Sequence, residues 1–166
     1  MYHVLFMCTA NICRSPLAEA ILQRKVRESG MEELIYVESS GTWAMDGQSS
    51  SDLMCRVALE NGLDLSKHRS QAMGLEMLKQ ADLILVMTPT HKNELLNIFP
   101  HFKEKIFTLT EFGRKNPPAK NAIDDPIGMN LNFYRRIYSE LEREINRVWE
   151  EIKRRALEKA EISSSG

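Results

Sequence analysis

The chain has 166 residues, of which 43% are apolar and 27% are charged, as expected for one ordinary globular domain with a real core. The net charge of −1 gives no support to a general nucleic-acid or membrane binder, because such proteins are usually more basic. No stretch is long and apolar enough to span a bilayer, and three cysteines are too few for a disulfide framework, so we expect a cytoplasmic protein with reduced thiols.

The first predicted element is a strand over residues 4–7, where four apolar residues follow one another. A loop over residues 8–14 follows it. A helix then begins at Ser15-Pro16, because serine caps helices and proline fits their first turn. Next come a second strand over residues 35–38 and a second helix over residues 51–60.

The second half of the chain continues this alternation. It predicts a strand over residues 83–87, a helix over 90–97 and a strand over 106–109. The last predicted helix covers residues 132–160, because its apolar residues fall on one face: Ile137, Leu141, Ile145, Val148 and Ile152. We expect residues 1–160 to form a single domain and the serine-rich residues 161–166 to be a disordered tail.

Strands that alternate with helices predict an α/β fold, in which an open, mostly parallel sheet has helices on both faces. Ligands of such sheets bind beyond the carboxyl ends of the strands. This rule directs attention to the loop after the first strand, which covers residues 8–14.

This loop holds three features that suit phosphate chemistry. A loop that curls around a helix start aims several backbone N–H groups at one anion, and Arg14 can grip a phosphate with two hydrogen bonds. The same positive field favours the reactive thiolate of Cys8. Five residues between Cys8 and Arg14 are enough to close a ring around a tetrahedral anion. Each residue alone also has an ordinary structural interpretation, since cysteine is often buried in a core and arginine is usually solvated.

The whole segment is more specific than its parts: Cys8-Thr9-Ala10-Asn11-Ile12-Cys13-Arg14-Ser15-Pro16. It resembles the loop C-x-G-N-x-C-R-S-P of the low-molecular-weight protein tyrosine phosphatases, with Ala10 in place of the glycine. Nearly the whole chain shares the resemblance, through Ser39-Ser40-Gly41, His68-Arg69-Ser70, the run from Ala81 to Thr88, and Asp124-Asp125-Pro126. The family has one three-layer αβα domain with a four-stranded, parallel, doubly wound sheet, which agrees with the four strands predicted above.

The resemblance implies a role for each site residue. Cys8 is the expected nucleophile, Arg14 the group that holds the phosphate and its transition state, and Asp125 the general acid and base. The expected phosphate-binding residues are Thr9, Ala10, Asn11, Ile12, Cys13 and Arg14. Supporting roles are implied for Ser15, which hydrogen-bonds the Cys8 thiolate, and for Ser39 and His68, which brace Asn11. The expected chemistry uses no metal and no cofactor.

The family resemblance favours phosphotyrosine as the substrate, reached through a deep cleft with apolar walls. The expected cleft residues are Ile12, Trp43 and Ile127, although many family members have an aromatic residue where this chain has Ile127. A bacterial branch that dephosphorylates arginine is the alternative. That branch resembles this chain in its C-T-x-N start and in the segment around His91-Lys92. It has threonine at the position of Ile12, however, and Ile12 offers no hydroxyl group. The expected partners are phosphotyrosine proteins, with phosphate or other oxyanions as ligands, and the expected state is a monomer.

The family uses a cysteine at the position of Cys13 in a reversible disulfide with the nucleophile, so the resemblance implies a redox role for Cys13. The alternative is that Cys13 is a buried, inert thiol. Two rival functions stay open on this fold. Thioredoxin-linked arsenate reduction needs two further cysteines near the third strand, and residues 70–113 contain none. A non-catalytic phosphate-binding module would lack the nucleophile or the acid, and both are present here.

Overall fold

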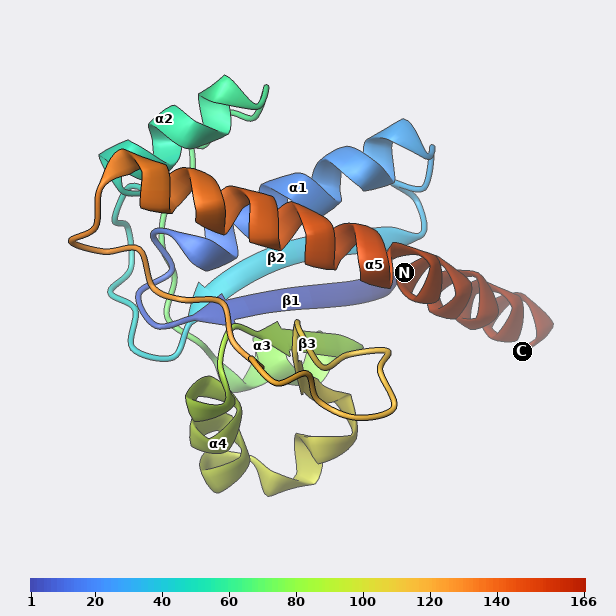
Figure 1. The fold of residues 1–166 in the computed structure, drawn as a ribbon. Coiled ribbons are helices and arrows are strands. Elements are labelled where there is room, and N and C mark those ends of the chain that lie inside the picture. The colour runs from blue at the N-terminus through green and yellow to red at the C-terminus, as the bar shows by residue number, and fades with distance from the viewer.

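Four parallel strands form one sheet in the order β2-β1-β3-β4 in the computed structural model, which describes residues 1–166 (Figure 1). The strands are β1 Tyr2–Cys8, β2 Ile35–Gly41, β3 Leu83–Val86 and β4 Ile106–Thr108. All four strands predicted from apolar runs are therefore confirmed, and β1 and β2 extend further toward their carboxyl ends than predicted. The parallel α/β fold class is confirmed as well.

Helices cover both faces of this sheet (Figure 1). They are α1 Arg14–Glu28, α2 Asp52–Glu60, α3 Leu75–Gln80, α4 Pro89–Ile98 and α5 Leu131–Ser165, with a 3₁₀ helix, η1, over Pro100–Lys105. The four predicted helices correspond to α1, α2, α4 and α5. The sequence did not predict α3 and η1, because α3 has six residues with one buried side chain and η1 has none buried. Helices this short lack an apolar period.

The two faces of β1 contribute to two separate cores, because neighbouring side chains of a strand point to opposite faces. Val4 and Phe6 belong to the larger core of 33 buried residues, beneath α1, α2 and α5. Leu5 and Met7 belong to a smaller core of 8 buried residues, which α3 and α4 cover. β1 is thus buried on both faces, which explains its unbroken apolar sequence.

The helix α5 is longer than predicted. We expected residues 161–166 to be a disordered tail, whereas α5 continues to Ser165. The Ser164 and Ser165 hydroxyl groups donate to the Glu161 carbonyl at 3.0 and 2.7 Å, and no proline or glycine interrupts the helix before Gly166. None of the helices has both the length and the apolar character that crossing a membrane requires.

The strand order determines where a ligand can bind. From β1 the chain passes through α1 to β2 on one side, and it later returns to β3 on the other side of β1. The carboxyl ends of β1 and β3 therefore border a switch point of the topology, where parallel sheets open a crevice. The loop that follows Cys8 begins at this point.

Candidate active site

The loop between β1 and α1 lines a cavity of about 280 Å³. Cys8 is the last residue of β1, and Arg14 is the first residue of α1. The cavity is lined by Cys8, Thr9, Ala10, Ile12, Cys13, Arg14, Asp125 and Ile127. The structure thus brings together the three residues predicted to carry the chemistry, Cys8, Arg14 and Asp125, although Asp125 lies 117 positions after Cys8 in the chain (125 − 8).

Asn11 shapes the loop from inside. Its φ of 58° is the only positive φ outside glycine, and asparagine tolerates this left-handed conformation better than most residues. Its buried side-chain amide donates to the Ser15 hydroxyl at 2.8 Å and to the Ser39 hydroxyl at 2.9 Å. Its side-chain oxygen accepts from the Gln71 N–H at 3.0 Å. Every polar atom of this side chain is therefore held by a neighbour.

Ser15 lies between Asn11 and the sulfur of Cys8. The Ser15 hydroxyl oxygen is 2.9 Å from Cys8 Sγ. The Ser15 hydroxyl accepts from Asn11, and its single hydrogen has two acceptors within reach, the Cys8 sulfur at 2.9 Å and the Ser40 carbonyl at 3.4 Å. The shorter contact favours the sulfur. A hydroxyl that donates to sulfur stabilises the thiolate, which is the nucleophilic form of cysteine.

A second layer of contacts braces the loop through His68, Ser39 and Glu19. His68 Nε2 donates to the Asn11 carbonyl at 2.8 Å, and the Ser39 hydroxyl donates to the Glu19 carboxyl at 2.9 Å. Burial raises the pKa of Glu19 to about 7 and lowers the pKa of His68. The sequence predicted His68 and Ser39 and missed Glu19, whose contact with Ser39 depends on how α1 packs against β2.

Arg14 and Asp125 face each other across the cavity. The Arg14 side chain is only 5% exposed, and its Nη1 donates to the Ile123 carbonyl at 2.9 Å. Its remaining guanidinium N–H groups make no hydrogen bond within the chain, and Nη2 lies 3.8 Å from Asp125 Oδ2. Asp125 is 52% exposed and accepts from the Ile127 N–H at 3.1 Å. An anion in this cavity would meet free guanidinium donors, with the Asp125 carboxyl group at its open side.

The apolar cleft residues occupy two different places. Ile12 and Ile127 line the cavity, as expected for walls. Trp43 does not line it, and the residue is 77% exposed, although its backbone N–H donates to the Thr9 carbonyl at 3.0 Å. The structure therefore places the Trp43 backbone against the loop, with the indole mostly in solvent.

Cys13 is buried in the same loop, where its thiol donates to the Ser51 hydroxyl at 3.1 Å. Burial raises the pKa of the Cys13 thiol to about 11, against smaller opposing effects such as this hydrogen bond. Cys13 is consequently a neutral thiol at pH 7. It lines the cavity together with Cys8, and both cysteines are free.

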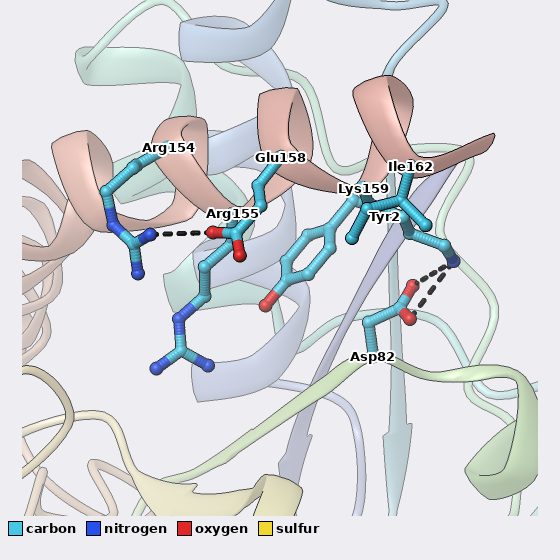
Figure 2. A pocket seen from close by; sticks show the side chains of 7 residues that line it. All are labelled: Tyr2, Asp82, Arg154, Arg155, Glu158, Lys159 and Ile162. Carbon is cyan, nitrogen blue, oxygen red and sulfur yellow. Dashed lines mark hydrogen bonds and ion pairs between the residues drawn. The ribbon is translucent and has the colours of Figure 1, made fainter. Parts of the chain in front are cut away.

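The largest cavity of the molecule, about 430 Å³, lies elsewhere. Figure 2 shows its lining, which comes from Tyr2 at the start of β1, from Asp82 before β3 and from the last turns of α5. Its cations are already paired: Lys159 donates to Asp82 at 2.8 Å and Arg154 to Glu158 at 2.7 Å. Paired cations attract an added anion weakly. Arg14 also faces a carboxylate, at 3.8 Å, but most of its guanidinium N–H groups make no hydrogen bond, so the cavity beside Arg14 suits an oxyanion better than this one.

Known proteins with similar sequences include two kinds of phosphatase. A protein-arginine-phosphatase of Geobacillus stearothermophilus is 36% identical over 151 residues, which are 91% of this chain and 96% of that protein. The low molecular weight protein-tyrosine-phosphatase Ptp of Acinetobacter johnsonii is 35% identical over 117 residues, which are 70% of this chain and 78% of that protein.

Solved structures of both kinds of phosphatase share the fold of this chain. The YwlE arginine phosphatase from Geobacillus stearothermophilus has a TM-score of 0.84 and 35% identity, over 95% of this chain and 97% of that one. A low molecular weight protein tyrosine phosphatase from T. tengcongensis has a TM-score of 0.81 and 37% identity, over 91% of this chain and 99% of that one.

The family model with the description low molecular weight phosphotyrosine protein phosphatase matches residues 3–158. This range includes the whole loop from Cys8 to Arg14 as well as Asp125. The chain therefore belongs to the low molecular weight phosphotyrosine protein phosphatase family.

Proposed function

We propose that this phosphatase hydrolyses phosphotyrosine in proteins through a phosphate covalently bound to Cys8. The observation that carries the proposal is the cavity that Cys8, Arg14 and Asp125 line together. A nucleophile, a cation and an acid around one cavity are the groups that transfer of a phosphoryl group requires.

In the first step the Cys8 thiolate attacks phosphorus, and the bond between phosphorus and the tyrosine oxygen breaks. Asp125 transfers its proton to that leaving oxygen. In the second step Asp125 takes a proton from water, whose oxygen attacks the cysteinyl-phosphate. Inorganic phosphate leaves, and Cys8 returns to the thiolate.

The charge that builds up on the phosphoryl oxygens needs donors that are already in place. The backbone N–H groups of residues 9–14 and the free guanidinium N–H groups of Arg14 supply them in this proposal. Asn11, Ser15, Ser39 and His68 keep the loop in its shape through the hydrogen bonds described above. No metal or cofactor takes part in these steps.

Two variants test the mechanism. Cys8→Ser should abolish turnover of an aryl phosphate such as p-nitrophenyl phosphate while binding of inorganic phosphate persists. Asp125→Asn should lower kcat by roughly 10²- to 10⁴-fold, the usual contribution of a general acid. The measurements are steady-state kinetics over a pH range and calorimetric titration with phosphate. Full activity of Cys8→Ser would refute the proposal.

Phosphoarginine is a second candidate substrate, because relatives named protein-arginine-phosphatase are 36% and 28% identical to this chain. The cavity supports the aromatic ester, since Ile12 and Ile127 offer apolar surface and no hydroxyl group. We expect a higher kcat/KM for phosphotyrosine than for phosphoarginine. Ile12→Thr should raise the rate on phosphoarginine. Ile12→Val is the matched control, because valine has the shape of threonine without its hydroxyl group. A higher kcat/KM for phosphoarginine than for phosphotyrosine in the unaltered protein would overturn the tyrosine assignment.

We propose a redox role for Cys13, which shares the cavity lining with Cys8. Hydrogen peroxide oxidises the Cys8 thiolate to a sulfenic acid; the Cys13 sulfur then forms a disulfide with Cys8, and water leaves. After peroxide treatment, dithiothreitol should restore activity to the unaltered protein and much less to Cys13→Ser. Equal recovery of both proteins would contradict the role.

The cellular setting proposed here follows from the same chemistry. Phosphotyrosine proteins are the proposed partners, and phosphate or another oxyanion is the proposed ligand. A nucleophilic thiol persists in the reducing cytoplasm, which is the proposed compartment. We propose that the enzyme acts as a monomer, because a single chain already supplies Cys8, Arg14 and Asp125 to the cavity and needs no second copy to complete it.

A further inference from the structure

His91, in the helix α4 that follows β3, contacts the active-site loop. Strand β3 lies beside β1, and the segment after β3 leads through Thr88 into α4. The Thr88 hydroxyl caps α4 by accepting from the His91 backbone N–H at 3.2 Å. This arrangement places His91 in the first turn of α4, with Nε2 2.9 Å from the hydroxyl oxygen of Thr9. Thr9 is exposed and lines the cavity, whereas His91 is only 4% exposed.

The hydrogen bonds around His91 favour one tautomer. The Thr88 hydroxyl oxygen accepts from the His91 backbone N–H, and its hydrogen can be donated to His91 Nδ1 at 3.2 Å, which gives each group of the pair one role. With Nδ1 as the acceptor, a neutral imidazole carries its hydrogen on Nε2 and donates it to Thr9. Burial and the nearby Arg14 lower the pKa of His91 to about 4, which keeps the ring neutral at physiological pH.

This tautomer determines what Thr9 can offer a ligand. A hydroxyl oxygen that accepts from His91 Nε2 keeps its own hydrogen for another partner. Thr9 lines the cavity, where that partner can be an oxygen of a bound phosphoryl group. In the opposite tautomer the Thr9 hydrogen would be bound to His91, and only lone pairs would face the anion.

We infer that the Thr9 side-chain hydroxyl is an additional hydrogen-bond donor to the phosphoryl group, and that His91 is the residue that positions it. The inference rests on the proposed function and adds a side-chain donor to the backbone N–H groups and Arg14. His91 itself does not touch the substrate; it acts through Thr9. The sequence predicted Thr9 as a phosphate-binding residue but not its contact with His91, which depends on how α4 lies beside the loop.

Thr9→Val keeps the shape of the side chain and removes the hydroxyl group. We expect inorganic phosphate, as a competitive inhibitor, to bind about tenfold more weakly to this variant, the usual effect of losing a hydrogen bond to a charged group. Thr9→Ser keeps the hydroxyl and should bind within about twofold of the unaltered protein. Thr90→Val changes an exposed threonine of the same helix and serves as the control without effect.

A double-mutant cycle tests the positioning role of His91. His91→Leu should weaken phosphate binding in the unaltered background and add nothing in the Thr9→Val background. His91→Gln, whose amide can reach the place of Nε2, should recover part of the affinity. Equal losses in both backgrounds would overturn the role, because a purely structural defect acts without Thr9. Thermal unfolding of each variant shows whether it is folded.

The tautomer can be measured in the unaltered protein, which needs no variant to fold. The ¹⁵N chemical shifts of His91 should show a hydrogen on Nε2 and none on Nδ1; the reverse pattern would overturn the inference. Unchanged phosphate affinity in Thr9→Val would also overturn it while leaving the proposed function intact. An unaltered protein that hydrolyses no aryl phosphate would instead overturn the proposed function.

Discussion

Cys8 and Cys13 are two buried cysteines of one loop with different surroundings. The Cys8 sulfur lies 2.9 Å from the Ser15 hydroxyl, closer than the Ser40 carbonyl that competes for the same hydrogen at 3.4 Å. Cys13 donates to Ser51 instead, and burial raises its pKa to about 11. Because the thiolate and not the thiol reacts with electrophiles, the two cysteines should differ in reactivity at neutral pH.

Alkylation tests this difference. At pH 7 iodoacetamide should modify Cys8 and spare Cys13, because the Cys13 thiolate forms only as the pH approaches about 11. Inorganic phosphate should protect Cys8. Peptide mass mapping of the folded protein measures both, with the phosphate-free reaction as the control. Modification of Cys13 as fast as Cys8 at pH 7 would contradict the assignment.

At single residues, the sequence predicted what lies close in the chain and missed what the fold brings near. Asparagine tolerates a left-handed backbone, so the shaping role of Asn11 could be anticipated from its type, and its φ is 58°. Glu19 and His91 could not be anticipated in this way. Their contacts with Ser39 and Thr9 depend on how α1 and α4 pack against the sheet.

Gly41, the last residue of β2, lies directly against the backbone of the phosphate loop. An added Cβ at Gly41 would lie 2.4 Å from the Thr9 carbonyl oxygen, 2.7 Å from Ala44 Cβ and 3.1 Å from the Asn11 nitrogen. Two of these three contacts are with the backbone of the phosphate loop. Glycine is therefore required here by space, not by an unusual φ.

Gly41→Ala should displace the loop, because no side chain can pass so close to a carbonyl oxygen. We expect a loss of roughly 1–3 kcal/mol in the free energy of unfolding, typical of overpacking, together with weaker phosphate binding. Urea unfolding and calorimetric titration measure the two effects. Gly74→Ala is the matched control, since nothing lies within 4 Å of its added Cβ. Equal behaviour of the two variants would show that the loop tolerates displacement.

Among the elements, those with a long apolar pattern were predicted and the short ones were not. The four strands have apolar runs because the sheet is covered on both faces. The helix α3 has one buried side chain and therefore left no periodic signal. The serine-rich end of α5 was predicted as disordered from composition, but the hydrogen-bonded helix continues to Ser165.

At the scale of the whole molecule, two of the cavities lie at opposite ends of the sheet. The larger one, beside Tyr2 and Lys159, has cations that are already neutralised by ion pairs (Figure 2). The smaller one lies at the carboxyl ends of β1 and β3, where the strand order reverses, and it holds the free donors of Arg14. The sequence predicted this end of the sheet from topology alone.

The position of a bound oxyanion tests the central claim most directly. In a crystal structure with vanadate, we expect the vanadium bonded to Cys8 Sγ and its oxygens held by the backbone N–H groups of residues 9–14 and by Arg14. Vanadate bound instead beside Tyr2 and Lys159, with the Cys8 sulfur uninvolved, would contradict the account.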